Sequence, residues 1–197
     1  TLLYRVSPLH SQTREAKIKK KKGDDLPKDT LVIMNLKSGQ KQVYPRLKGV
    51  KYGQQLQRYV AFQTLPEPSE DKKGPKPDKS AGTPLYLMDI RTSQIDTIDI
   101  VEKYIFTDEG EYLSYITKPG KKDSVGVRAL HIKDLASGED MPVLEGDKKM
   151  KVELPVYDEV YKRFAFYAQE DTLKSEQKFS NIYLYNIIKT ASCQANI

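Results

Sequence analysis

One sequence motif occurs four times in this chain, and this repetition limits the folds that the chain can adopt. In each copy, alternating apolar residues lead into an Asn or Asp, and the first three copies continue into a turn of small residues. The copies cover residues 31–39, 85–93, 130–138 and 182–187. Their Asx residues are Asn35, Asp89, Asp134 and Asn186, spaced 54, 45 and 52 positions apart. Such a period indicates a repeat architecture, and the alternation predicts a strand that enters a hairpin.

A second motif, which is rich in aromatic residues, lies between these copies and repeats with nearly the same period. It covers residues 59–62, 112–115 and 164–167, and its copies start 53 and 52 positions apart. Each period therefore predicts an inner strand, an aromatic strand, the strand before the Asx residue, and an outer strand. The predicted outer strands are residues 40–47, 94–101 and 139–145. Four antiparallel strands repeated radially form the blade of a β-propeller.

The predicted fold class is therefore all-β, with β-propeller blades of four antiparallel strands and almost no helix. We expect about 14 strands in about three and a half blades, fewer than the 4–8 blades with which propellers usually close. The approximate blade boundaries are residues 1–47, 48–101, 102–146 and 147–197. We expect a fragment of a larger propeller, with open ends that meet the remaining blades or a second copy of the chain.

Period-2 alternation also predicts which side chains lie in or between the blades. The predicted core residues are Leu85, Leu87, Phe106, Leu113, Tyr115, Ile132, Phe164, Phe166, Ile182 and Leu184. Four connections in equivalent positions, at residues 14–30, 65–84, 117–126 and 168–180, are hydrophilic. Because these connections hold few apolar residues, we expect loops there.

Composition limits the classes of partner and the cellular compartment. The 33 basic and 27 acidic residues give a net charge of only +6, so no nucleic acid partner is expected. The single cysteine, Cys193, excludes an internal disulfide. No apolar run approaches the length of a membrane span. We expect a periplasmic or extracellular location, and a cytoplasmic one stays open.

No pattern in the sequence predicts catalysis. The chain has no Gly-x-Ser-x-Gly elbow, Walker loop or Gly-x-Gly-x-x-Gly motif. His10 and His131 lack the neighbouring ligands of a zinc site, and the lysine run at residues 17–22 is typical of a solvated loop. Acidic pairs fall at predicted turns, at residues 108–109, 139–140 and 170–171. We therefore assign no catalytic, metal or cofactor-binding residue and expect no cofactor, while the substrate-binding residues stay unknown.

Tyrosine is abundant, with 13 copies, whereas tryptophan is absent. Most tyrosines lie on predicted strands: Tyr86, Tyr104, Tyr112, Tyr115, Tyr161, Tyr167, Tyr183 and Tyr185. The main interpretation is packing between blades. A stacking platform for a ligand is the alternative.

The sequence pattern of residues 85–90 and 106–115 resembles that of the β-propeller in the prolyl oligopeptidase and dipeptidyl peptidase IV family of serine peptidases. The resemblance covers residues 30–188, although the Asp-Glu-Gly turn of residues 108–110 is replaced in the neighbouring periods. It implies a propeller that caps an α/β-hydrolase domain, which lies outside this chain, and filters peptides on their way to a Ser-Asp-His triad. No Glu-Glu pair is present, so the resemblance does not extend to aminopeptidase specificity.

Three functions follow as alternatives. The first is a non-catalytic propeller of a serine peptidase, whose partners are peptide substrates and the hydrolase domain or remaining blades. The second is a propeller that serves as a protein-binding scaffold, although the Trp-Asp dipeptide of many such repeats is absent. The third is an enzyme with its site in the propeller channel, such as a lactonase or glycosidase. The chain alone is expected not to be an enzyme.

Overall fold

The computed structural model describes the chain except residues 55–57, 67–79, 122–125, 148, 170–179 and 188–197. The described part contains one α-helix, one 3-10 helix and fourteen strands. The helices are α1 (His10–Ile18) and η1 (Gly23–Asp25). The strands are β1 (Leu2–Val6), β2 (Thr30–Met34), β3 (Lys41–Tyr44), β4 (Leu47–Tyr52), β5 (Tyr59–Thr64), β6 (Thr83–Asp89), β7 (Ile95–Phe106), β8 (Tyr112–Thr117), β9 (Arg128–Asp134), β10 (Asp140–Gly146), β11 (Lys151–Val152), β12 (Val156–Asp158), β13 (Arg163–Gln169) and β14 (Asn181–Asn186).

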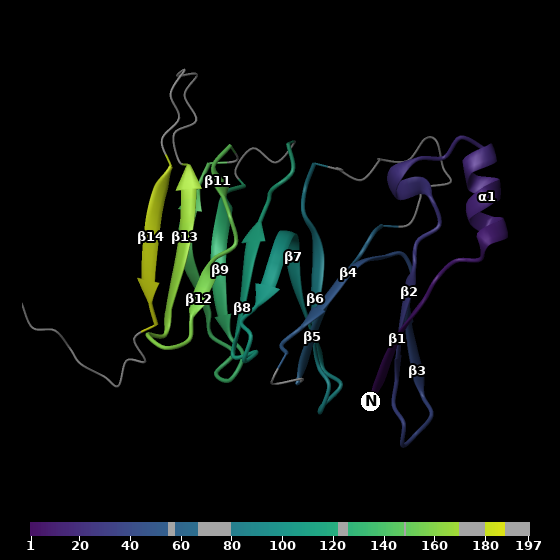
Figure 1. Ribbon diagram of the computed structural model, residues 1–197, viewed down its shortest axis with the longest axis horizontal. Coiled ribbons are helices and arrows are strands. Elements are labelled where there is room, and N and C mark those ends of the chain that lie inside the picture. The colour runs from purple at the N-terminus through teal and green to yellow at the C-terminus, as the bar shows by residue number, and fades with distance from the viewer. Residues whose placement is uncertain (55–57, 67–79, 122–125, 148, 170–179, 188–197) are drawn as a thin grey trace, which may run out of the picture.

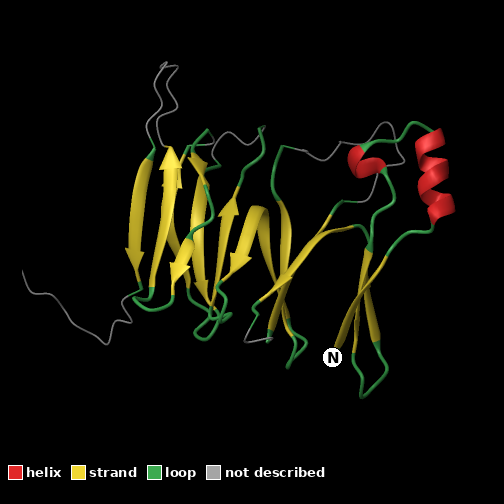
Figure 2. Ribbon diagram, viewed as in Figure 1, coloured by secondary structure: helices red, strands yellow, loops and turns green. Residues whose placement is uncertain are grey.

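All of the strand pairs are antiparallel, so the predicted antiparallel β structure is confirmed. The first sheet has the order β1-β2-β3, and a seven-stranded sheet runs from β4 to β10 in chain order. In the last sheet, β13 pairs with β14 on one side and with β11 and β12 on the other. Figures 1 and 2 show these sheets following one another along the molecule.

Strand β7 differs from the prediction, which ended an outer strand at Val101 and began a new inner strand after it. The structure has one strand of 12 residues, whose first part pairs with β6 and whose second part pairs with β8. At the change of partner, Ile100 has a φ of 52° and the register shifts on both sides. A bend of this kind redirects a strand without ending it.

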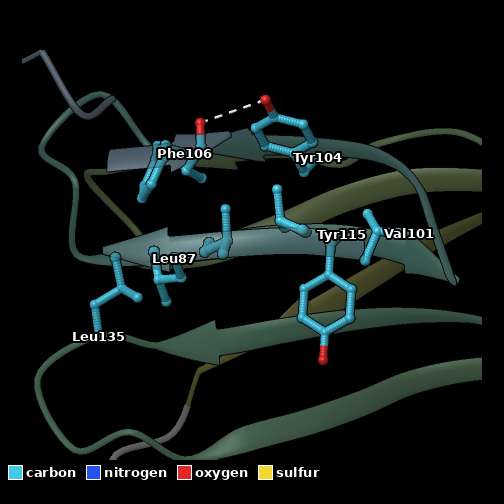
Figure 3. Packing of buried hydrophobic residues seen from close by; sticks show 9 residues of the cluster. Leu87, Val101, Tyr104, Phe106, Tyr115 and Leu135 are labelled. Atoms are coloured by element: carbon cyan, nitrogen blue, oxygen red, sulfur yellow. Dashed lines mark hydrogen bonds between the residues drawn. The ribbon is translucent and has the colours of Figure 1, made fainter. Parts of the chain in front are cut away.

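We define four units by the repeated Asx residues. The first unit is β1–β3, and the second is β4–β6 with the first part of β7. The third is the rest of β7 with β8–β10, and the fourth is β11–β14. Neighbouring units pack face to face. Figure 3 shows this between the second and third units, where Leu87 lies near Phe106 and Leu135.

The same turn follows the repeated strand in the first three units. The Oδ1 atoms of Asn35, Asp89 and Asp134 each accept a hydrogen bond from the backbone N–H two residues later, at 2.7–2.9 Å. The amide four residues after each Asx residue then donates to its carbonyl oxygen, at 2.8–2.9 Å. This Asx turn explains why the sequence repeats Asn or Asp at these positions.

Eight of the ten predicted core residues are buried, and two are exposed. The buried ones are Leu85, Leu87, Phe106, Leu113, Tyr115, Ile132, Phe164 and Phe166. The prediction was wrong for Ile182 and Leu184, which are exposed on β14. Tyr183 and Tyr185 alternate with them on β14 and point to the opposite face, where they pack against Phe166 and its neighbours. Ile182 and Leu184 have no following sheet against them among the described residues.

Helix α1 was not predicted, and the expectation of a loop at residues 14–30 was wrong for residues 14–18, which belong to this helix. Among its residues only Ala16 is buried, so the helix lacks the apolar stripe by which helices are recognised in sequences. At its start, the side-chain oxygen of Gln12 accepts a hydrogen bond from the N–H of Leu9. At its end, Lys20 adopts a φ of 57° and the N–H of Lys21 donates to the carbonyl of Ala16, which is a typical helix stop.

Candidate functional site

A hollow lies between strand β4 and the end of strand β7, which are the inner strands of the second and third units. Its volume is about 600 Å³. It is lined by Val50, Lys51, Tyr52 and Gln54 from one side and by Ile105, Phe106, Thr107 and Asp108 from the other. Tyr52 and Ile105 are exposed to solvent. This volume falls within the usual range for sites that hold small ligands, about 300–1,000 Å³.

The hollow carries one ammonium group and one carboxylate. The Nζ atom of Lys51 lies 5.6 Å from the ring centroid of Tyr104, so a cation–π contact holds the lysine at the wall of the hollow. Burial raises the pKa of the Tyr104 phenol, which therefore stays neutral at physiological pH. The N–H of Gln54 donates to the carbonyl oxygen of Asp108 at 3.1 Å, which ties the two rims together.

The side chains of this hollow are suited to binding a ligand. Lys51 and Asp108 offer groups of opposite charge, Tyr52 offers an aromatic surface, and Ile105 offers an aliphatic one. An extended peptide carries the complementary groups, namely an ammonium or carboxylate end and apolar side chains. No pattern in the sequence predicted this site, because its residues lie on two strands more than 50 positions apart and form no motif.

A second polar cluster joins Tyr115, His131 and Asp140. Tyr115 donates its hydroxyl hydrogen to Oδ2 of Asp140, and Nδ1 of His131 lies 3.2 Å from Oδ1 of the same carboxylate. The rings of Tyr115 and His131 stack with centroids 4.8 Å apart. Burial alone would raise the pKa of Asp140, but the hydrogen bonds from His131 and Tyr115 hold it below its usual value. Burial and the Asp140 contact raise the pKa of Tyr115.

The repeat explains this cluster as packing. The same cross-strand position holds the stacked pair Phe62–Tyr86 in the second unit and the stacked pair Phe166–Tyr183 in the fourth. In the third unit His131 takes the place of the second aromatic ring. Its imidazole therefore supplies the ring that a tyrosine supplies in the other two units, and Asp140 is the partner of its polar edge.

A third cluster surrounds Glu102 on β7. Lys118 donates to its Oε1 at 2.8 Å, and Arg128 donates to its Oε2. Burial alone would raise the pKa of Glu102, but Lys118 and Arg128 hold it below its usual value. Both oxygens of the carboxylate are already paired, so this group links β7 to the residue after β8 and to β9 rather than offering a ligand.

The other polar residues weighed in the sequence lie apart from one another. The lysines of residues 17–22 are exposed at the end of α1 and in the turn after it, and His10 is exposed at the start of α1. Glu109 approaches Lys162 at 3.3 Å in a surface ion pair. Residues 170–171 lie outside the described residues. In the part of the chain that the structure describes, no group of His, Cys, Asp and Glu could hold a metal ion.

Some of the tyrosines are buried between units, and others are exposed to solvent. Tyr104, Tyr112 and Tyr115 are buried between units, as the main interpretation expected. Tyr161 was placed on a strand, but it lies exposed in the turn between β12 and β13. Tyr167 is exposed on β13. Among the described residues, no helix is long and apolar enough to cross a membrane.

No model of a protein family matches this sequence, and no curated protein sequence matches it. Several solved structures are similar to this one over part of their chains. One is the β-propeller domain of the Trilobed protease from Pyrococcus furiosus, with 15% identity and a TM-score of 0.49, covering 84% of this chain and 49% of that one. Another is the tricorn protease, with 12% identity and a TM-score of 0.45, covering 72% of this chain and 13% of that one.

A third is the acylaminoacyl peptidase of Pyrococcus horikoshii, with 11% identity and a TM-score of 0.46. The match covers 81% of this chain and 26% of that one. In each case this chain spans less than half of the length of the solved chain. At these identities the likeness concerns the fold and does not extend to activity.

Proposed function

We propose that this chain is a non-catalytic β-propeller portion of a prolyl-oligopeptidase-like serine peptidase, which gates peptides on their way to a hydrolase domain outside the chain. The observation that carries the proposal is the hollow between β4 and β7. In a propeller the inner strands line the central channel, and a peptide that passes through this channel meets the side chains at their edges.

The charges in the hollow suit a peptide as ligand. The ammonium group of Lys51 complements a peptide carboxylate, and the carboxylate of Asp108 complements a peptide ammonium group. Both are exposed enough to exchange partners, and a gate requires this kind of weak, reversible contact. The resemblance of residues 85–90 and 106–115 to the prolyl oligopeptidase propeller agrees with the same class of substrate.

The direct test of the gating role is a binding measurement with short peptides. Proline-containing octapeptides are titrated into the isotope-labelled chain and amide shifts are followed by NMR. We expect shifts around Lys51 and Asp108, and weaker binding in Lys51→Ala and Asp108→Asn by about twofold to fivefold, since each removes one exposed charge contact. Lys37→Ala, in the exposed turn after β2, is the matched control and should bind as the wild type does. Shifts that avoid the hollow would refute this role.

The catalytic half of the proposal has its own test. The open reading frame that encodes this chain should contain a Gly-x-Ser-x-Gly motif beyond the propeller, followed by an acidic residue and a histidine in the order of α/β-hydrolases. The purified chain should not hydrolyse fluorogenic prolyl substrates. A reading frame without such a domain would favour the scaffold alternative. Turnover that one substitution in this chain abolishes would contradict the non-catalytic assignment.

A further inference from the structure

Helix α1 and the turn after it carry almost all of the net charge of this chain. Residues 14–22 hold six basic side chains and one acidic side chain, a net charge of +5, whereas the whole chain carries +6. The six basic residues, which we call the basic patch, are all exposed: Arg14, Lys17, Lys19, Lys20, Lys21 and Lys22. Within the described part of the chain, none of them forms an ion pair. The remainder of the molecule is almost neutral.

The outward face of α1 combines this charge with an apolar side chain. Ala16 is the one buried residue of the helix, so it marks the side that faces the rest of the chain. With 3.6 residues per turn, Arg14 and Ile18 each point roughly 160° away from Ala16. Ile18 is 70% exposed. An isoleucine therefore projects into solvent beside an arginine, on the side of the helix that is farthest from the body of the molecule.

A hollow of about 380 Å³ lies along the same face of the helix. Its lining residues recur at the spacing of neighbours on one helix face: His10, Thr13, Arg14, Lys17 and Ile18. The hollow thus presents two cations next to an aliphatic side chain. A phosphate group that is joined to hydrocarbon, as in a phospholipid, carries the complementary chemistry.

The backbone keeps the lysines that follow the helix close to Ile18. The N–H of Lys20 donates to the carbonyl of Lys17 at 2.9 Å, and the N–H of Lys21 donates to the carbonyl of Ala16 at 3.0 Å. The chain therefore turns back at the end of α1 instead of extending away from it. The charges of residues 19–22 are concentrated around one end of the helix, which Figure 1 shows beside the first unit.

Other covers suit this patch less well. Units of the repeat cover one another through an apolar pair four and two positions before the Asx residue, such as Leu85 and Leu87, which are 0% and 3% exposed. Cations buried against such a unit would lose water without gaining a partner. Single-stranded nucleic acid stacks on aromatic rings, and residues 9–22 contain no Phe, Tyr or Trp. Arginine is the preferred partner of carboxylates at protein interfaces, whereas five of these six cations are lysines.

We propose that α1 and the turn after it bind the surface of a membrane that contains anionic phospholipids. The lysines contact the headgroups as point charges, and Ile18 enters the boundary between headgroups and acyl chains. Clusters of about 4–8 basic residues bind anionic lipid surfaces in this way, and the basic patch has six. The inference does not depend on the peptidase role, because it concerns only residues 10–22.

The test is co-sedimentation of the full chain with lipid vesicles. We expect binding to phosphatidylcholine vesicles that contain about 30% phosphatidylglycerol, and no binding to vesicles of phosphatidylcholine alone. Raising the salt concentration from about 0.1 M to about 0.5 M should release the protein, because salt screens exposed charges. A wild-type chain that does not bind the anionic vesicles would overturn the proposal.

Two variants of equal net charge test the position of the basic patch. The patch variant combines Lys17→Gln, Lys19→Gln, Lys21→Gln and Lys22→Gln. The control variant replaces four lysines that are exposed elsewhere, by Lys37→Gln, Lys41→Gln, Lys149→Gln and Lys151→Gln. Each cation at an anionic surface contributes roughly a fivefold change in binding, so the patch variant should bind at least about 100-fold more weakly. The control variant should bind nearly as the wild type does, and an equal loss in both would contradict the proposal.

A third variant separates a lipid surface from other polyanions. Ile18→Ser keeps every charge and removes the inserted side chain, so it should weaken vesicle binding by about tenfold. Val160→Ser is the matched control, since Val160 is 82% exposed in the turn between β12 and β13. Thermal melts followed by circular dichroism confirm that each variant is folded. Unchanged binding of Ile18→Ser, or a wild type that prefers an acidic peptide or an oligonucleotide to the vesicles, would refute a lipid partner.

Discussion

Single side chains set the turns that join the repeated strands, and the three complete turns differ at one informative position. The fourth residue after the Asx residue is Gly39 in the first unit, Ser93 in the second and Gly138 in the third. Their φ values are 70°, 60° and 81°. Glycine adopts this left-handed region without steric cost, whereas serine does not. The second unit therefore carries local strain that the other two avoid.

The substitution Ser93→Gly should stabilise the folded chain by about 0.5–1 kcal/mol. Relief of the left-handed strain outweighs the entropy that glycine adds to the unfolded chain. The reciprocal change, Gly138→Ser, should destabilise it by a similar amount. Urea unfolding followed by circular dichroism measures both. A Ser93→Gly variant less stable than the wild type would show that the serine makes a contact of its own worth more than the strain.

The carboxylate of Asp140 makes stability depend on pH at the acid end. Its pKa is lower in the folded chain than its usual value of about 3.9, so folding favours the charged form. The stabilisation is present above pH 4 and is lost as the pH falls through the lowered folded-state value. In Asp140→Asn this contribution is absent. The stability gap between wild type and variant should therefore be widest near neutral pH and should close in acid, as measured by urea unfolding from pH 7 to pH 3. A gap that does not change with pH would refute the assignment.

The helices and strands could be predicted from the sequence where they belong to the repeat. They could not be predicted where they depend on features that occur only once. The repeat of the sequence pattern predicted strands β2, β6, β9 and β14, because each contains alternating apolar residues before an Asx residue. The pattern did not reveal helix α1, whose exposed polar residues carry no apolar stripe. It also did not show that β7 continues through the junction between units, since a bend at a single residue, Ile100, leaves no trace in the hydrophobic pattern.

The bend in β7 depends on close approach of the backbone at Gly82. A Cβ atom at this position would lie 2.1 Å from the carbonyl oxygen of Ile100, and that carbonyl accepts a hydrogen bond from Lys118 at 2.8 Å. The N–H of Gly82 in turn donates to the carbonyl of Lys118 at 2.9 Å. The backbone therefore cannot move away without breaking the contacts that join β6, β7 and β8.

Gly82→Ala should destabilise the chain by at least about 1–3 kcal/mol, the usual cost of inserting atoms into a packed region. Gly49→Ala is the matched control, since its Cβ would lie at an ordinary 3.6 Å from the Tyr104 hydroxyl oxygen. That change should alter stability by less than about 0.5 kcal/mol. Thermal unfolding of the two variants gives the comparison. Equal losses would mean that the approach at Gly82 does not constrain the junction.

The whole molecule is a stack in which each unit buries the apolar pair of the unit before it. The sequence predicted the stack and most of its core, because period-2 alternation assigns each side chain to a face. It did not predict that Ile182 and Leu184 are exposed, because a residue pattern does not say whether a neighbouring sheet is present. The hollow between β4 and β7 was also missed, since it forms only when distant inner strands come together.

Reaction with a thiol reagent tests this stack most directly. Single cysteines are placed at equivalent positions by Ile33→Cys, Leu87→Cys, Ile132→Cys and Leu184→Cys, each in a Cys193→Ala background. In dilute protein the first three should react at least about 100-fold more slowly than the fourth, since a buried thiol reacts only after local opening. Four equal rates in dilute protein would contradict the stacked arrangement of the units.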